Sequence, residues 1–459
     1  MADRFDIKSE FETEGCFWEP ETPARSFSAH LSANSKQIEL TKAAERVDIQ
    51  RAFLGSGDEP EPAVLHGDTQ LGPCTLIGLQ EVGGFGSGNL SNPTIIRALR
   101  FRASLCIVGL HLANESAFEI RSATFNYAGL EGWLRSDAQF NITDAGTEIR
   151  HPPKSSAFFD FSIISLRIRL QLRVASNLQF KPDGTHSAEA EPCFIVEPLT
   201  SASLEELLDI AYRLENFLSL WVGTSVRLRT VSLIGPSDKK GWIIRRAPTS
   251  GPAAEPDIQA RIRADASQLA AAIVVWMTTP KDFRPVENLV YGVIRSTPLF
   301  VETEFLSLAQ ALESFHRLTD TSTIAERSLF KQICSALTQS IKAICNDSVL
   351  AERLEDAIRY ANEPSFRNRM NSLISRIRAD RAEVLLGDLA LFERTLRQTR
   401  NFFTHPGIRR QAEVLTGTKE IFLFSQKLHA FLRLLLLLSL GISEDAAFEP
   451  VRYQAFRWK

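Results

Sequence analysis

The chain has 459 residues, more than a single hydrophobic core usually supports, so two or three domains are expected. Hydrophobic residues make up 44% of it and charged residues 23%, a balance that excludes long disorder, a collagen-like repeat and a coiled coil. Lys and Arg (52) nearly balance Asp and Glu (55), and the net charge of -3 excludes binding to nucleic acid through overall charge.

The sequence shows no clear targeting signal, metal-binding motif or membrane-spanning segment. The first fifteen residues are acidic and lack an apolar run, so no signal peptide is expected. The six cysteines include no Cys-x-x-Cys pair, and no His is spaced to complete a zinc site, so we expect neither a metal nor a cofactor. The apolar run 430–442 is too short to span a membrane and contains Arg433, so it predicts a buried helix. We therefore expect a cytoplasmic protein with free thiols and no membrane partner.

The first two hundred residues show a period of two. Apolar and polar residues alternate without interruption over 166–174, and shorter β-type runs occur at 26–31, 74–79, 97–102, 118–127 and 139–149. Turn-forming residues separate these runs, and no helical period stands between them. The pattern predicts an antiparallel sandwich or barrel-like sheet rather than alternating strands and helices.

One helix interrupts the β-type pattern. Ser203 and Glu206 have the spacing of a capping box, and apolar residues then recur at three- and four-residue steps as far as 221, which predicts a helix over 203–221. Strands are expected at 225–234 and 241–246, followed by a linker at 247–257 rich in Pro and Gly. Together these segments define an expected N-terminal domain, 1–290.

From about residue 258 the pattern is almost wholly helical. Helices are expected near 258–276, 303–318, 324–345, 348–361, 367–379, 382–403 and 417–440. We therefore predict an α+β multidomain protein, with a β-rich N-terminal domain, an all-α helical bundle over 300–445 and a C-terminal tail over 446–459.

The segment 396–407 carries the most chemical information. Arg400 follows Leu396 by four residues, at the edge of an apolar helix face, so a cation is expected close to the core. His405 would lie about 140° from Arg400 on a continuing helix, but Pro406 disfavours the α conformation of the residue before it. The chain should turn at His405 and can bring the imidazole back towards the guanidinium, while Asn401 could orient either group.

An Arg and a His at one site suit phosphodiester chemistry on RNA. The imidazole titrates near neutrality and can move the proton of a ribose 2′-OH, while the guanidinium can neutralise a pentavalent phosphate. Residues 367–410 contain ten arginines against four acidic residues, a local basic surface hidden by the overall charge. Arg394, Arg397, Arg409 and Arg410 are the expected RNA contacts. The spacing alone is weak evidence, because 25–30 repeats it within a predicted strand.

Several segments resemble one protein family. The hexapeptide Arg-Asn-Phe-Phe-Thr-His at 400–405 is similar to the Arg-x(4–6)-His motif of HEPN-domain ribonucleases. The segment 305–317, with its Leu312-Glu313 step, resembles the opening helix of the ApeA-like HEPN group. The segments 129–134 and 214–220 resemble the ApeA N-terminal domain that precedes such HEPN domains.

This resemblance implies a bacterial anti-phage abortive-infection protein. It implies a metal-independent endoribonuclease that cleaves host RNA, with tRNA as the candidate, by transesterification through the 2′-OH. Arg400 and His405 would be the catalytic pair and Asn401 the polar motif position; the role of Glu313 stays open. Expected partners are RNA, a phage protein that triggers the N-terminal domain, and a second copy in a homodimer or higher assembly. Two alternatives remain: a non-catalytic HEPN module that binds a nucleotide or RNA, and a protein-interaction adaptor.

Overall fold

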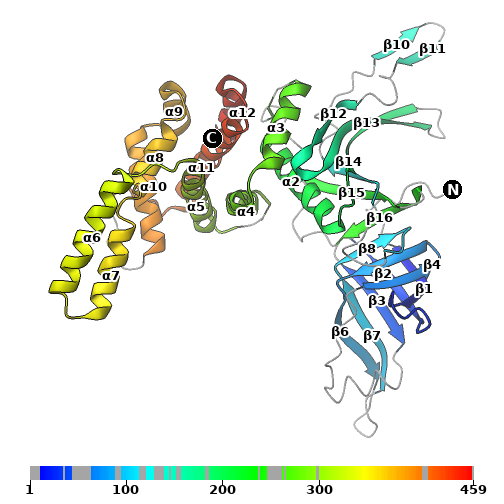
Figure 1. Ribbon diagram of the computed structural model, residues 1–459. Coiled ribbons are helices and arrows are strands. Elements are labelled where there is room, and N and C mark those ends of the chain that lie inside the picture. The colour runs from blue at the N-terminus through cyan, green and yellow to red at the C-terminus, as the bar shows by residue number, and fades with distance from the viewer. Residues whose placement is uncertain are drawn as a thin grey trace. The chain divides into compact units, whose positions relative to one another are not determined.

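The computed structural model describes residues 11–34, 37–43, 64–87, 95–112, 120–128, 139–143, 146–150, 157–180, 186–235, 238–245, 261–262, 265–295, 299–405 and 412–456. The chain divides into two compact units (Figure 1). The first comprises Met1–Ser219, Ser225–Ile258 and Asp265–Thr278, and the second Leu220–Thr224, Gln259–Ala264 and Thr279–Lys459. The segment 129–134 and the expected linker 247–257 lie outside the described residues.

The first unit is built on a sheet of fourteen strands. Every neighbouring pair in it is antiparallel, as the alternating sequence predicted. In sheet order the strands are β12 (Ala157–Ile163), β13 (Ile168–Phe180), β14 (His186–Pro198), β9 (Ser122–Ala128), β15 (Arg227–Ile234), β16 (Lys240–Arg245), β8 (Leu105–Val108), β5 (Gly72–Ile77), β4 (Val64–Thr69), β1 (Phe11–Trp18), β2 (Phe27–Ala33), β3 (Ile38–Ala43), β7 (Ile95–Ala103) and β6 (Gln80–Ser87). A separate hairpin is formed by β10 (Gln139–Thr143) and β11 (Gly146–Arg150).

Alternating side chains along the strands give the sheet a buried apolar face and a polar face. In β2 and β3, Leu31 and Leu40 stand opposite each other and are buried with Phe17 of β1 in one apolar cluster. On β13, Arg169 points outward and its guanidinium contacts Asp160 through two hydrogen bonds, of 2.7 and 2.6 Å. Arg169, on the basic face of 166–174, is therefore paired with a carboxylate on the neighbouring strand.

Two helices pack beside the strands β12 to β15 (Figure 1). Helix α2 (Leu204–Val222) starts with the predicted capping box, since Ser203 N donates to the Glu206 carboxylate and Glu206 N donates to Ser203 Oγ. It contacts β9 through a hydrogen bond from Tyr127 Oη to Ala211 O, 2.8 Å long. Helix α3 (Ala266–Thr278) lies against β12 and α2 and begins later than the expected residue 258.

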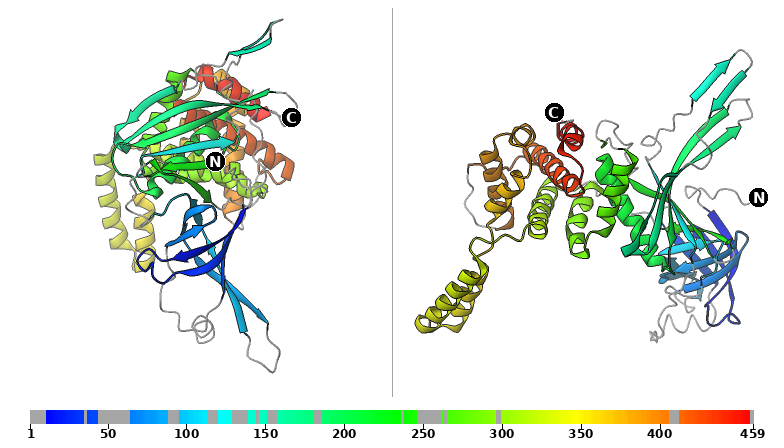
Figure 2. Two further views of the ribbon diagram at one scale, coloured as in Figure 1. Left: turned by 90° about the vertical axis from the view of Figure 1, so that its right-hand side faces the viewer. Right: turned by 45° about the horizontal axis from the view of Figure 1, so that its top comes forward.

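The second unit is helical, as predicted, and the chain is therefore an α+β protein. Its helices are α4 (Arg284–Arg295), α5 (Val301–Thr319), α6 (Arg327–Ile344), α7 (Ser348–Arg359), α8 (Phe366–Ile374), α9 (Ala379–Leu386), α10 (Leu389–Thr404), α11 (Thr418–Ser439) and α12 (Glu444–Phe456). Figure 2 shows the same helices from two further directions, with the α6–α7 hairpin extending from the rest of this unit.

Three features differ from the sequence prediction. The helix expected over 382–403 is broken into α9 and α10, because Gly387 has a φ of 87°, a conformation that favours glycine, and Asp388 then caps α10. The segment expected as a tail forms α12, whose pattern was obscured by Pro450 inside the helix. Helix α4, which the sequence analysis did not expect, spans the expected domain boundary at residue 290 and clusters with the helical unit.

Helix α11 forms the centre of the helical unit. Among the described residues it is the one helix long and apolar enough to cross a membrane by length and composition, and most of its apolar stretch is buried inside the protein. Phe424 stacks on Phe392 of α10 with the ring centres 5.1 Å apart, and also contacts Phe305 of α5. The buried helix predicted at 430–442 is confirmed.

Arg433, inside this leucine-rich stretch, is only 2% exposed. Its guanidinium donates hydrogen bonds to Leu220 O and Trp221 O, at 2.8 and 2.9 Å, and to the side chain of Gln454 on α12 at 2.8 Å. Gln454 in turn donates to Gly223 O at 3.0 Å. A buried arginine is tolerated here because carbonyl groups at the last turn of α2 accept hydrogen bonds from its guanidinium.

Candidate active site

Arg400 lies near the end of α10, facing α5 and α8. Its Nη2 donates to Oε2 of Glu313 on α5 at 3.4 Å, and its guanidinium carbon lies 5.4 Å from the ring centre of Phe366 on α8. Both contacts favour the cation, one by charge and one through the aromatic face. The side chain stays 27% exposed, so a ligand can reach part of it.

Asn401 and Thr404 complete the last turn of α10 around Arg400. Arg400 Nη1 donates to Asn401 Oδ1 at 3.3 Å, so the residue after the arginine does contact it, as the sequence analysis considered. Thr404 Oγ1 donates to Arg400 O at 2.9 Å and satisfies a carbonyl at the helix end. The turn that carries the motif is therefore held by local hydrogen bonds.

His405 is the C-cap of α10. Its φ of −126° and ψ of 90° are extended, and its N–H donates to Asn401 O at 3.0 Å, so the helix ends where Pro406 predicted. The imidazole is exposed and makes no hydrogen bond with any residue that the structure describes. The predicted approach to Arg400 is not realised as a direct bond, because the guanidinium is drawn towards Glu313 and Phe366 instead.

Glu313 is the residue that orients the arginine. Its side chain is 13% exposed, and its two oxygens accept from different arginines, Oε2 from Arg400 and Oε1 from Arg317 one turn further along α5 at 3.2 Å. Arg317 also pairs with Glu363, which accepts a 2.8 Å hydrogen bond from the buried Arg369 of α8. A continuous chain of alternating charges therefore runs from Arg400 through Glu313 and the exposed pair Arg317 and Glu363 to the buried Arg369.

This chain of charges ends at a buried histidine. Burial lowers the pKa of His316, and the positive charges of Arg369, Arg376 and Arg317 act in the same direction, whereas the charge of Asp320 opposes them. His316 Nε2 lies 3.3 Å from an oxygen of Asp320 without hydrogen-bond geometry. Hydrogen bonds from Ser322, and a further one from Ser372, lower the pKa of Asp320 to about 2. The neutral imidazole and the ionised carboxylate are the favoured forms at neutral pH.

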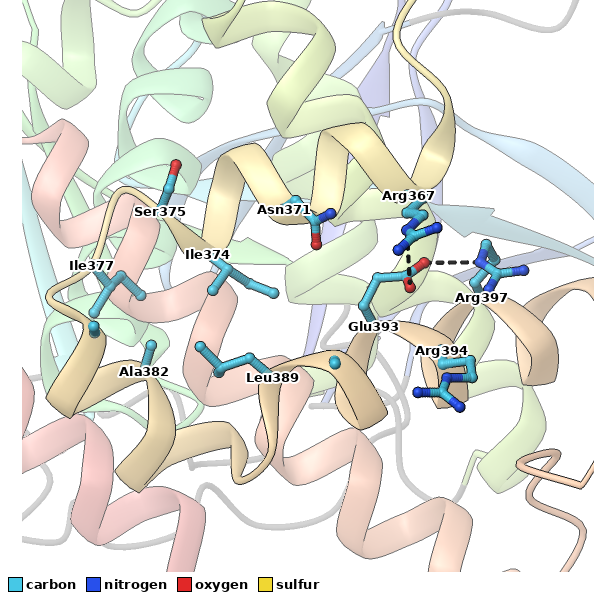
Figure 3. Close-up of a pocket in the computed structure, with 12 residues that line it drawn as sticks. Arg367, Asn371, Ile374, Ser375, Ile377, Ala382, Leu389, Glu393, Arg394 and Arg397 are labelled. Atoms are coloured by element: carbon cyan, nitrogen blue, oxygen red, sulfur yellow. Dashed lines mark hydrogen bonds and ion pairs between the residues drawn. The ribbon is translucent and has the colours of Figure 1, made fainter.

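Two of the four arginines predicted to contact RNA, Arg394 and Arg397, lie in the part of the chain that the structure describes. Arg397 donates to Glu393 Oε1 at 2.8 Å. Arg394 lies one turn of α10 before Arg397 and donates to Glu413 at 3.3 Å. Both arginines line a cavity of about 830 Å³ between α8, α9 and α10 (Figure 3). Arg409 and Arg410 lie outside the described residues.

The sequence analysis named Glu313 but left its role open, and it did not single out Glu393; both are supporting carboxylates in the structure. Glu313 is 87 residues from Arg400, and no local pattern joins α5 to α10. Glu393 could have been found, because it precedes Arg397 by four residues and such pairs face each other on a helix. Among the described residues, no three His, Cys, Asp or Glu side chains form a group that could hold a metal ion.

The arrangement is suited to binding and activating a phosphate. A partly exposed guanidinium is held from behind by a carboxylate, and an exposed imidazole follows it at the end of the same helix. The guanidinium can bind a phosphate bidentately, and an imidazole can accept or donate a proton. The side chains of Arg400 and His405, and not the helix end itself, are therefore the groups that could contact a phosphate.

Two family models match the chain. Residues 12–247 match the family model of ApeA N-terminal domain 1, and residues 306–446 match that of the Apea-like HEPN domain. The chain therefore belongs to the ApeA-like HEPN proteins, a family that points to abortive infection and to ribonuclease activity in general. No curated protein and no solved structure shows a significant match.

Proposed function

We propose that the protein is an anti-phage abortive-infection endoribonuclease that cleaves host RNA, with tRNA as the candidate substrate. The observation that carries this proposal is the Arg400 guanidinium, half-buried on Glu313 and Phe366 and partly open to solvent, on the helix that ends in the exposed His405. The family comparison supports a HEPN nuclease, and the geometry supports a phosphate as the group that Arg400 contacts.

The reaction is an internal transesterification. The 2′-oxygen of the substrate forms a bond to phosphorus, the bond from phosphorus to the 5′-oxygen breaks, and His405 accepts the 2′-hydroxyl proton. Arg400 neutralises the pentavalent phosphorane, and Asn401 orients the guanidinium through its Oδ1. The products are a 2′,3′-cyclic phosphate and a 5′-hydroxyl, the latter formed when the leaving oxygen takes a proton. No metal-bound water is needed in this scheme.

Cleavage assays test this scheme directly. Arg400→Ala and His405→Ala should each lower the cleavage rate of total tRNA by about 100-fold or more, while the exposed Arg452→Ala should leave it unchanged. Activity should survive EDTA, and a substrate with a 2′-deoxy nucleotide 5′ of the scissile bond should stay intact. Cleavage of that deoxy substrate would refute the roles of both residues. RNA binding without cleavage by the wild type would instead favour the non-catalytic HEPN module.

We also propose a homodimer, formed through the α6–α7 hairpin. A single Arg–His pair leaves the acid for the 5′-oxygen unprovided, and a second copy could supply it. Neither helix of the hairpin contains a buried residue, although both are amphipathic. Seven large aliphatic side chains on it are at least 41% exposed: Leu329, Ile333, Leu337, Ile344, Val349, Leu350 and Leu354.

A second hairpin of the same kind fits this apolar face. Helix α6 carries three basic residues and no acidic one, whereas α7 carries one more acidic than basic residue, so α6 of one copy complements α7 of the other. Asn362 fixes the hairpin base by exchanging hydrogen bonds with Ala325, at 2.7 and 3.1 Å, so the face is presented in a defined orientation. Two copies would then form a four-helix bundle with a two-fold axis.

The N-terminal unit is proposed as the sensor. It is a large antiparallel sheet unit, and the two residues of the Arg–His site lie in the helical unit. We propose that in the cytoplasm it binds a phage protein and that binding favours the active arrangement of the helical unit. Infection of cells that express the full chain or a chain lacking 12–247 tests this: loss of the response to phage is expected, and an unchanged response would refute the sensor role.

A further inference from the structure

A pocket next to the Arg400 site has the composition of a nucleotide-binding site. Its wall is formed by α8, α9 and α10 and contains three arginines, Arg367, Arg394 and Arg397, against one acidic residue, Glu393. The volume of about 830 Å³ lies within the range of about 300–1,000 Å³ that small-ligand sites occupy. The net charge of its lining is +2, which favours an anionic occupant.

Glu393 arranges two of these arginines. It is 4% exposed, and its carboxylate lies 3.8 Å from Arg367 Nε and accepts a 2.8 Å hydrogen bond from Arg397 Nε (Figure 3). A buried carboxylate is costly unless it is paired, so the two guanidinium groups are held beside it. One carboxylate cannot neutralise two guanidinium groups, and the surplus positive charge faces the pocket.

The opposite end of the pocket is apolar. Figure 3 shows Ile374, Ile377, Ala382 and Leu389 away from the arginines, with Asn371 between the two ends. The Asn371 side chain makes no hydrogen bond with any described residue, so its amide is available to a ligand. An amide can donate and accept at once, which is what the edge of a nucleobase requires, and the apolar end can contact the base face.

The pocket is continuous with Arg400 on two helices. Arg397 precedes Arg400 by one turn of α10, a rise of about 4.5 Å. On α8, Phe366 packs under the Arg400 guanidinium, and the next residue, Arg367, lines the pocket. A phosphate at Arg400 and a nucleotide in the pocket would therefore lie next to each other along one strand.

We infer that this pocket binds one nucleotide of single-stranded RNA adjacent to the scissile phosphate, an inference that rests on the proposed function. Arg367 and Arg397 grip the phosphate of that nucleotide, and its base enters between Asn371 and the apolar end. The base must leave its stack to enter, so the substrate is a loop or an unpaired end rather than a duplex. An anticodon loop or another exposed loop of tRNA has the required form.

RNA binding tests the arginines without relying on cleavage. In the His405→Ala background, affinity for a single-stranded oligoribonucleotide is measured by fluorescence anisotropy over a range of salt concentrations. The double variant Arg367→Ala, Arg397→Ala should lower affinity about 10-fold or more and reduce the logarithmic salt slope by about 0.7, the value for one lost phosphate contact. Arg452→Ala, an exposed arginine on α12 with a carboxylate partner of its own, is the matched control.

A variant that fills the pocket tests whether a base binds at its apolar end. Ala390 is exposed and lines the pocket, so Ala390→Trp occupies the cavity without removing an arginine, and Ala390→Ser is its control. The tryptophan variant should raise KM about 10-fold with little change in kcat. Adenosine 5′-monophosphate should compete with RNA better than inorganic phosphate does; equal competition would overturn the assignment of the apolar end to a base.

The two proposals fail in different ways. If the wild type cleaves RNA and the pocket variants match Arg452→Ala in affinity, salt slope and KM, the pocket inference is wrong and the proposed function stands. If the wild type binds RNA through the pocket but does not cleave it, the proposed reaction is wrong and the pocket remains an RNA site.

Discussion

Replacing Glu313 should weaken catalysis through Arg400. In the structure its carboxylate lies 3.4 Å from Arg400 Nη2 and is 13% exposed, so the pair is largely shielded from water. A hydrogen bond between charged groups contributes about 1.5–3 kcal/mol. If that energy holds the guanidinium in its working position, Glu313→Ala should slow single-turnover cleavage by about 10- to 100-fold. Glu313→Gln keeps an acceptor oxygen and should lose less.

A double-mutant cycle separates positioning from direct catalysis. If Glu313 acts only through Arg400, the double variant Glu313→Ala, Arg400→Ala should cleave no more slowly than Arg400→Ala alone. The exposed Glu449→Ala, which removes a carboxylate from a surface pair on α12, is the matched control and should cleave like the wild type. Thermal midpoints of all variants are measured in parallel to exclude unfolding.

Two results would refute this reasoning. A Glu313→Ala protein that cleaves as fast as the wild type would show that the ion pair does not position the guanidinium. A double variant far slower than Arg400→Ala would show that Glu313 acts on the substrate by itself.

Three further predictions concern stability and assembly. Burial lowers the pKa of His316 below 6.5, so the unfolded chain binds more protons than the folded one as the pH falls from 7 to about 5, and the free energy of unfolding decreases. Urea titrations at several pH values should show a smaller decrease for His316→Gln. An unchanged dependence of the unfolding free energy on pH would contradict this role of His316. Arg433→Ala leaves three acceptors unpaired and should reduce the free energy of unfolding by about 3–5 kcal/mol. The exposed control Arg452→Ala should reduce it by at most about 1 kcal/mol. Equal reductions would show that the buried hydrogen bonds of Arg433 do not stabilise the fold. Ile333→Glu should convert the dimer to a monomer in analytical ultracentrifugation, and an unchanged mass at micromolar concentration would exclude the hairpin interface.

Local patterns in the sequence determined most of the secondary structure. Alternation over 166–174 predicted β13, and the spacing of Ser203 and Glu206 predicted the start of α2, because strand faces and capping boxes depend on residues close together in the chain. The end of α10 at His405 follows from the steric effect of Pro406. The candidate pair Arg400 and His405 was identified from such local information together with the family resemblance.

Only the tertiary structure decided what surrounds these residues. Glu313 reaches Arg400 across 87 residues, and Arg433 finds its acceptors at Leu220 and Trp221, more than 200 residues away, because packing joins helices that no periodicity connects. The same holds for exposure: α6 and α7 have the apolar spacing of core helices, yet their large aliphatic side chains face solvent. An amphipathic pattern specifies that a helix has an apolar face, whereas the arrangement of the other helices determines whether that face is covered.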